Sequence, residues 1–180
     1  MRRWNGLSGL LVCGLVAGMV ALPTQAAAWV AFAKITTSNG TITGGATQKG
    51  YEGQIEVLGL GSSLDLPVES SPTTGVSVGR LQLGRFQFVK VFDIATPRLV
   101  TQVASSLSLP KVEFTIFKTT TTGTSVPGFR ITLTNAILTK LEPIYDPGAT
   151  PSTLEKVELF YNTYQWTDLI TGATGTASRF

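Results

Sequence analysis

The run from Val76 to Phe92, VSVGRLQLGRFQFVKVF, alternates apolar and other residues with a period of two. This alternation puts every second side chain on the same face of an extended segment, which predicts a strand with one buried face. The isolated glycines Gly79 and Gly84 interrupt the run and indicate bulges or bends. The same period returns at Gln54 to Leu60 and at Lys111 to Lys118. A chain with this pattern builds sheet, and it must pair or cover the edges of that sheet.

One stretch departs from the alternation and has the signals of a helix: FDIATPRLVTQVASS, Phe92 to Ser106. Thr96 suits the N-cap, and Pro97 suits the first helical position because its φ is fixed and its missing N–H would have no partner there. Apolar residues then recur at helical spacing. We expect a helix from Pro97 to about Ser106. Its predicted packing face consists of Leu99, Val100 and Val103.

Further strand candidates lie at both ends of the chain. Residues 29–35 predict an opening strand, residues 129–145 predict one strand or a bent pair, and Leu154 to Leu169 predicts the last strand region. The total is a mainly β fold: a small antiparallel β-barrel or sandwich of two sheets with one flanking helix. We expect a single domain over residues 29–169 and a mobile tail over residues 170–180.

The first residues have the order of features found in secretory signal peptides. Two arginines follow the initial Met, residues 6–22 form an uncharged apolar run, and a proline precedes a small-residue cleavage site at Ala26 to Ala28. We expect residues 1–28 to be removed. A membrane anchor is the alternative, but the run is at the short end of the roughly 17–25 residues that a spanning helix needs.

Removing this leader changes what the composition implies. The chain has 14 basic and 11 acidic residues, and the loss of Arg2 and Arg3 leaves 12 against 11. That near balance gives no argument for a nucleic acid or an anionic membrane as partner. The leader also holds the one Cys and both Met residues, and the chain has no His. We therefore expect no disulfide, no imidazole or thiolate chemistry, no cofactor and no metal site based on Cys or His.

Two motifs resemble reactive loops, but their surroundings favour structural roles. Ser108 to Lys111 fits the S-x-x-K pattern of some serine acyl-enzymes, yet the companion S-D-N and K-T-G motifs are absent, and Pro110 stands where that motif is helical. Gly59 to Gly61 resembles a phosphate-binding loop, but no G-K-[ST] follows.

Paired carboxylates and clustered aromatic residues are the other candidates for function. The pairs Glu56 with Asp65 and Glu155 with Glu158 alternate with apolar residues, so we predict that they face solvent and form no catalytic pair. We therefore expect no catalytic residue and no enzyme. Three aromatic residues of the last strand region could instead contact a sugar or protein ligand, although strand aromatics are more often core or interface. They are Tyr161, Tyr164 and Trp166.

Three stretches, in order, resemble the Hcp family, the tube protein of type VI secretion systems. The first is YEGQIEVLGLGSSL, which is similar to the family's early strand pair. The second, FQFVKVFDIATPRLVTQVASSLSLPKVEFTIFK, is similar to its central signature of strand, Asp, helix with an early Pro, and strand. The third, from ITLTN to YQWTD, is similar to its closing section. The resemblance covers about Phe32 to Asp168.

The resemblance implies a small β-barrel of two sheets with one flanking helix, whose subunits form hexameric rings that stack into a tube. The partners it implies are other copies of the chain and secreted effector proteins that contact the bore. The helix from Pro97 to Ser106 would be the flanking helix. No catalytic residue is implied, because ring edges and the bore carry the function.

The leader departs from the family pattern, since tube subunits assemble in the cytoplasm before they leave the cell. Two interpretations stay open. The chain is an exported relative of the tube protein, or translation begins at Met19 and the subunit is made in the cytoplasm and then secreted. A different class of function also stays open, an exported monomeric β-barrel that binds a sugar or protein ligand.

Overall fold

The computed structural model describes residues 31–71, 73, 75–145, 147–148 and 153–179. Its first elements are β1 (Ala31–Thr37), β2 (Gly40–Thr41), β3 (Ile55–Val57), β4 (Gly59–Gly61), β5 (Leu64–Asp65), β6 (Val68–Ser71), β7 (Gly75–Val78), β8 (Gln82–Leu83) and β9 (Phe86–Val91). They are followed by α1 (Thr96–Ser105), β10 (Ser108–Thr119), β11 (Ser125–Tyr145), β12 (Thr153–Phe160), β13 (Thr163–Asp168) and β14 (Thr174–Ser178). The prediction of a mainly β fold with one flanking helix is confirmed for the described residues.

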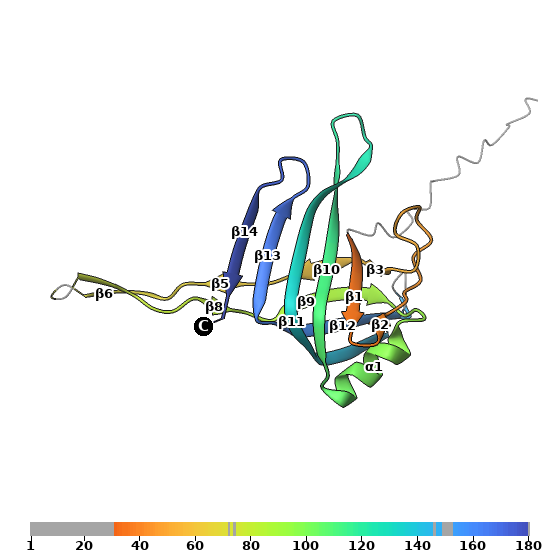
Figure 1. Ribbon diagram of the computed structural model, residues 1–180, viewed down its shortest axis with the longest axis horizontal. Helices are drawn as coiled ribbons and strands as arrows, with labels where there is room; N and C mark the ends of the chain where they lie inside the picture. The colour runs from red at the N-terminus through yellow and green to blue at the C-terminus, as the bar shows by residue number, and fades with distance from the viewer. Residues whose placement is uncertain (1–30, 72, 74, 146, 149–152, 180) are drawn as a thin grey trace, which may run out of the picture.

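Ten of the strands form one antiparallel sheet that folds into two layers (Figure 1). Along its main path the order is β2-β1-β10-β11-β12-β9-β4, with β13 and β14 added beside β11 and β3 beside β1. β3 pairs with β1, and β4, directly after it, pairs with β9. The segment 55–61 therefore joins the two layers on the side opposite β11.

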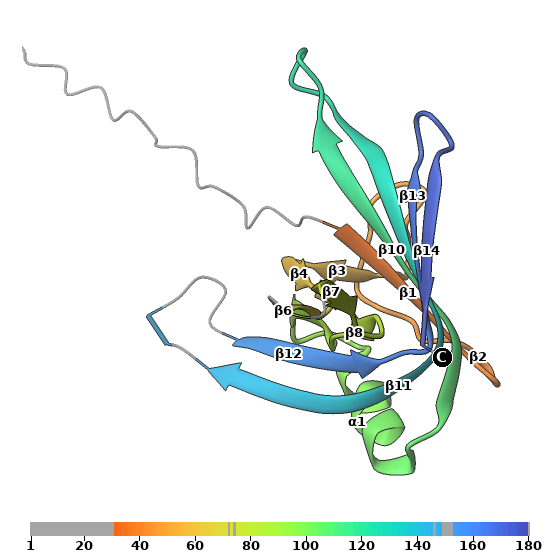
Figure 2. The ribbon, with the colours of Figure 1, turned by 90° about the vertical axis from the view of Figure 1, so that its left-hand side faces the viewer.

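The long strand β11 belongs to both layers. Its first half pairs with β10 and β13, and its second half pairs with β12. Figure 2 shows β11 turning from its place beside β10 and β13 to lie beside β12. The change of partner falls at Asn135, which is exposed and has a φ of 51°. Asn is among the few residues that adopt this left-handed conformation readily, so the residue is suited to the bend.

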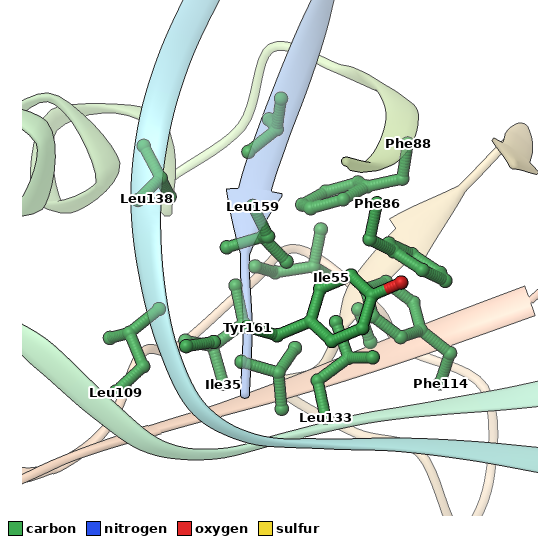
Figure 3. Close-up of a cluster of buried hydrophobic side chains, with 14 of the residues drawn as sticks. Ile35, Ile55, Phe86, Phe88, Leu109, Phe114, Leu133, Leu138, Leu159 and Tyr161 are labelled. Atoms are coloured by element: carbon green, nitrogen blue, oxygen red, sulfur yellow. The ribbon is translucent and has the colours of Figure 1, made fainter. Parts of the chain in front are cut away.

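The core lies between the layers, as Figure 3 shows. Phe114 of β10 contacts two residues of β9 in the opposite layer, with ring centroids 4.5 Å from Phe86 and 5.3 Å from Phe88. Tyr161, just after β12, sits among the labelled aliphatic side chains of the cluster. Burial of a large apolar side chain contributes about 1.5–3 kcal/mol, so these contacts hold the layers together.

Helix α1 occupies the predicted stretch, with two differences from the sequence prediction. The N-cap is Ala95, and Thr96 is the first residue of the helix. Leu99 is fully buried and Val103 packs partly against the core, but Val100 is 52% exposed. Leu99 and Val103 are four residues apart and share one face, whereas Val100 is rotated about 100° from Leu99. Val100 is therefore not part of the packing face within the subunit.

The structure tests the prediction for the C-terminal tail but not the prediction for the leader. Residues 174–178 form β14, paired with β13 over five residue pairs, so the prediction of a mobile tail is wrong for this segment. The sequence TGTAS, made of small and hydroxyl-bearing residues, gave no signal for this strand, which pairs through its backbone. The expected signal peptide, residues 1–28, lies outside the described residues. Within the described part of the chain, no helix has the length and apolar character to cross a membrane.

The bend in β11 gives a prediction for residue 135. Replacing Asn135 by Val should lower the free energy of unfolding by about 1–2 kcal/mol, because a β-branched side chain is strained in the left-handed region. Asn135→Gly should be close to neutral, since glycine adopts that conformation freely. Denaturant unfolding of the three proteins measures the difference. Equal losses in the two variants would contradict a role for the backbone conformation.

Candidate assembly surface

A two-stranded ribbon, residues 62–71 and 75–84, projects away from the two layers (Figure 1). It is made of two short paired segments, β5 with β8 and β6 with β7. Leu64 faces Leu83 near the root of the ribbon, and Val68 faces Val78 further out. The sequence predicted strand here but did not predict that the segment would leave the body of the protein.

The two glycines that interrupt the alternation allow the ribbon strands to approach closely. The amide of Gly79 donates to the carbonyl of Pro67 at 2.7 Å, and the amide of Gly84 donates to that of Ser63 at 2.9 Å. A Cβ added at Gly84 would lie 2.2 Å from Ser63 Oγ and 3.2 Å from Ser63 O. Gly79 keeps the backbones paired between the two short ladders, and Gly84 extends the pairing at the root of the ribbon.

One face of the ribbon is apolar and exposed. In the outer ladder Val68, Val76 and Val78 lie on one face, because opposite residues of a pair share a face and side chains alternate along each strand. Leu64 and Leu66 precede them on the outgoing strand, and all five apolar side chains are exposed. Their exposed fractions are Leu64 47%, Leu66 53%, Val68 59%, Val76 69% and Val78 60%. An isolated two-stranded ribbon is marginally stable in water, and a contiguous apolar face usually marks a protein contact. We call these five side chains the ribbon patch.

The three candidate contact aromatics do not form a platform. Tyr161 is fully buried, Tyr164 is 6% exposed, and only Trp166 reaches solvent, at 37%. The Trp166 ring lies 5.4 Å from that of Phe129 on the neighbouring strand. The predicted binding module with a Tyr161, Tyr164 and Trp166 platform therefore loses the side chains that would face a ligand.

The buried hydroxyl of Tyr161 has no hydrogen-bond partner among the described residues. Burial raises the pKa of Tyr161 above its ordinary value, with the positive charge of Arg179 opposing this shift. The ring therefore serves packing, while its hydroxyl carries a desolvation cost.

Removing only that hydroxyl should not harm the fold. Tyr161→Phe keeps the ring in the core and should raise the free energy of unfolding by about 1 kcal/mol, because an unsatisfied polar group is removed. Thermal and urea unfolding measure this change. A loss of stability of similar size would show that the hydroxyl has a bonding role.

A buried ion pair joins the layer that contains β9 and β12 to helix α1. Lys90 of β9 and Glu155 of β12 stand directly opposite each other and are both fully buried. Lys90 Nζ lies 2.5 Å from Glu155 Oε1, 2.8 Å from Asp93 Oδ1 and 2.7 Å from the carbonyl oxygen of Val91. The prediction that Glu155 faces solvent is wrong. Glu155 shares the parity of Val157 and Leu159, which face the core.

The same network fixes the start of α1 and an adjoining loop. The Thr96 hydroxyl donates to Glu155 Oε1 at 2.8 Å, so it points inward instead of capping the helix. Asp93 accepts the amide of Ala95 through Oδ1 and the amide of Gly45 through Oδ2, each at 2.9 Å. The helix, β9, β12 and the loop around Gly45 are thus held by one group of charges.

Breaking this ion pair should lower the free energy of unfolding more than removing both charges does. Lys90→Met should lower the free energy of unfolding by about 3–5 kcal/mol, because the Glu155 carboxylate is left buried and unpaired. The double variant Lys90→Met with Glu155→Leu should recover much of that loss. Urea unfolding of the single and double variants tests the coupling. A double variant that is as unstable as the sum of both single variants would contradict it.

The remaining motifs have structural positions. Ser108 to Lys111 opens β10, where Leu109 is buried, and Gly59 to Gly61 forms β4. Glu56 lies on β3 in the body, whereas Asp65 lies on the ribbon. Among the described residues, no group of three Asp, Glu, Cys or His side chains is placed to hold a metal ion.

The described residues form a mainly β protein with two layers, one flanking helix and a buried ion pair beneath that helix. Its projecting ribbon exposes the apolar side chains of the ribbon patch.

The chain belongs to the family described as type VI secretion system effector, Hcp, whose pattern matches residues 32–167. It is 31% identical to the "Major exported protein" of Pseudomonas aeruginosa over 160 residues, covering 81% of this chain and 92% of that protein.

Solved structures of Hcp proteins are similar to this chain. The Hcp1 protein of the E. coli EAEC 042 pathovar is 25% identical, with a TM-score of 0.71, covering 85% of this chain and all of that one. The secreted protein Hcp3 of Pseudomonas aeruginosa is 26% identical, with a TM-score of 0.69, covering 83% of this chain and 99% of that one. The resemblance seen in the sequence is confirmed, and this protein is an Hcp-like protein of type VI secretion.

Proposed function

We propose that the protein is a structural tube subunit that assembles with copies of itself into rings, hexameric as the family resemblance implies. The observation that carries this proposal is the ribbon patch, five apolar side chains between 47% and 69% exposed on a projecting ribbon. Packed against a second copy, each would leave water and favour association. The rings stack into a tube whose bore carries or accompanies secreted effector proteins.

The shape of the subunit favours a closed ring over a two-fold dimer. The ribbon projects to one side, away from α1 and from the loop that precedes β3 (Figure 1). When a ribbon packs on a different surface of the next copy, the contact is heterologous, and repeated contacts of this kind produce a ring or a filament. Function then rests on contacts between subunits, and we propose no catalytic activity.

We propose that the chain is exported. The relative named "Major exported protein" supports secretion, and the order of features in residues 1–28 supports a cleaved signal peptide. Under this proposal the ring forms outside the cytoplasm. If translation begins at Met19, the subunit instead assembles in the cytoplasm and leaves by the type VI apparatus. N-terminal sequencing of the protein from envelope and culture fractions distinguishes a start near Trp29 from one at Met19.

The ribbon patch gives a direct test of assembly. Val68→Lys and Val78→Lys each place a charge in the patch at residues that face one another. Each should weaken association of subunits about tenfold or more, because a buried ammonium replaces a buried apolar group. The free energy of unfolding of the isolated subunit should change by no more than about 0.5 kcal/mol, as for substitutions at other exposed positions. Sedimentation velocity measures association.

Ser77 provides the matched control. It stands between Val76 and Val78 on the same strand, is exposed, and points to the opposite face of the ribbon. Ser77→Lys should therefore leave association unchanged. Association that weakens equally in Ser77→Lys and Val78→Lys would contradict the patch as the contact surface.

A further inference from the structure

The root of the ribbon meets the C-terminal hairpin, β13 and β14. In Figure 1 the end of β14 points toward β8, although the two segments are far apart in sequence. The root itself is short: β5 and β8 share two residue pairs, and the amide of Gly84 adds a bond to Ser63. Two pairs do not fix the direction of a ribbon of this length, so contacts from outside the ribbon must contribute.

Arg179 supplies such a contact to the returning strand of the ribbon. Its Nε donates to the carbonyl oxygen of Tyr161 at 2.8 Å, and its Nη2 donates to the carbonyl oxygen of Leu83 in β8. The guanidinium also lies over the ring of Phe160, 4.2 Å from its centroid. The backbone amide of Arg179 donates to Asn162 O at 2.9 Å, which holds the residue in place.

A second contact holds the outgoing strand. The Tyr164 side chain of β13 is a neighbour of the side chain of Ser62, directly after β4. Burial raises the pKa of Tyr164, and the interaction with Ser62 partly opposes the increase. Ser62 and Leu83 flank the root on its two strands, so β13 and the residue after β14 each hold one side of the ribbon.

The chemistry of Arg179 is suited to positioning. Its guanidinium makes no ion pair with a carboxylate among the described residues, and the bonds described above go to backbone carbonyl oxygens. A planar group with donors in fixed directions, stacked on an aromatic ring, holds two carbonyls at a set distance and angle. Lysine has one point charge and cannot reproduce both bonds with the same geometry.

We infer that Arg179 and Tyr164 form a two-point clamp that sets the direction in which the ribbon leaves the body, with Arg179 as its main positioning residue. The clamp couples the C-terminal hairpin to the ribbon patch. Its effect on ring assembly rests on the proposed function. Its effect on the ribbon root does not, because it is a property of the single subunit.

Hydrogen exchange of the isolated subunit tests the clamp without reference to assembly. In Arg179→Met, amides of the root, including that of Gly84, should exchange about tenfold faster, while amides of β10 and the first half of β11 keep their rates. Arg179→Lys should give an intermediate increase. Tyr164→Phe keeps the buried ring, removes the hydroxyl that interacts with Ser62, and should speed exchange at the outgoing strand.

Arg98 is the matched control, an exposed arginine on α1 distant from the root in sequence and structure. Arg98→Met should leave exchange at the root within about twofold of the original protein. Unchanged root exchange in both Arg179→Met and Tyr164→Phe would overturn the clamp. A uniform increase across all strands in both variants would also overturn it, because the residues would then support the whole fold.

Sedimentation of the same variants separates the clamp from the proposed function. If the clamp and the ring are both correct, Arg179→Met loosens the root and also weakens association, while Arg98→Met does neither. If the original protein stays monomeric but Arg179→Met still loosens the root, the clamp stands and the ring proposal fails. If association is normal in a variant with a loosened root, control of assembly by the clamp is wrong.

Discussion

The ion pairs of the buried Lys90 side chain tie two strands, the start of the helix and a loop to one another. Lys90 is placed on β9, lies opposite Glu155 on β12, and reaches Asp93 at the start of α1. Asp93 in turn accepts the amide of Gly45, so the loop before β3 is tied to the same charge. Removing one member leaves another charged group without water or a partner. The helix is thus fixed by polar bonds at its start and by Leu99 along its length.

The second constraint is the exposed ribbon patch. The two layers hide their apolar faces from water, but the ribbon exposes its own, and no described segment of the subunit covers it. The helix and the buried pair stabilise the body, and the clamp at Arg179 and Tyr164 carries that rigidity to the root of the ribbon. A rigid body with a directed, apolar projection is the form that head-to-tail association requires, since a freely moving ribbon would pay conformational entropy on binding.

Much of this structure could be predicted from period-two alternation and one set of helix signals. The errors have specific causes. Alternation with apolar residues predicts that Glu155 faces solvent, but Glu155 shares the parity of Val157 and lies inside, as Lys90 shares the parity of Phe88 on the facing strand. Opposite charges at inward positions of two strands were the available signal. The ribbon could not be predicted, because local alternation is the same whether a hairpin joins the layers or leaves them.

Native mass spectrometry of the protein taken from the envelope and soluble fractions of its own cells tests ring assembly and export together, since it reports both the N-terminus and the mass of the assembly. We predict a complex several times the mass of the subunit, with subunits that begin near residue 29 in the exported fraction. A protein that is monomeric in every fraction would contradict it, because the ribbon patch would then remain exposed in the cell.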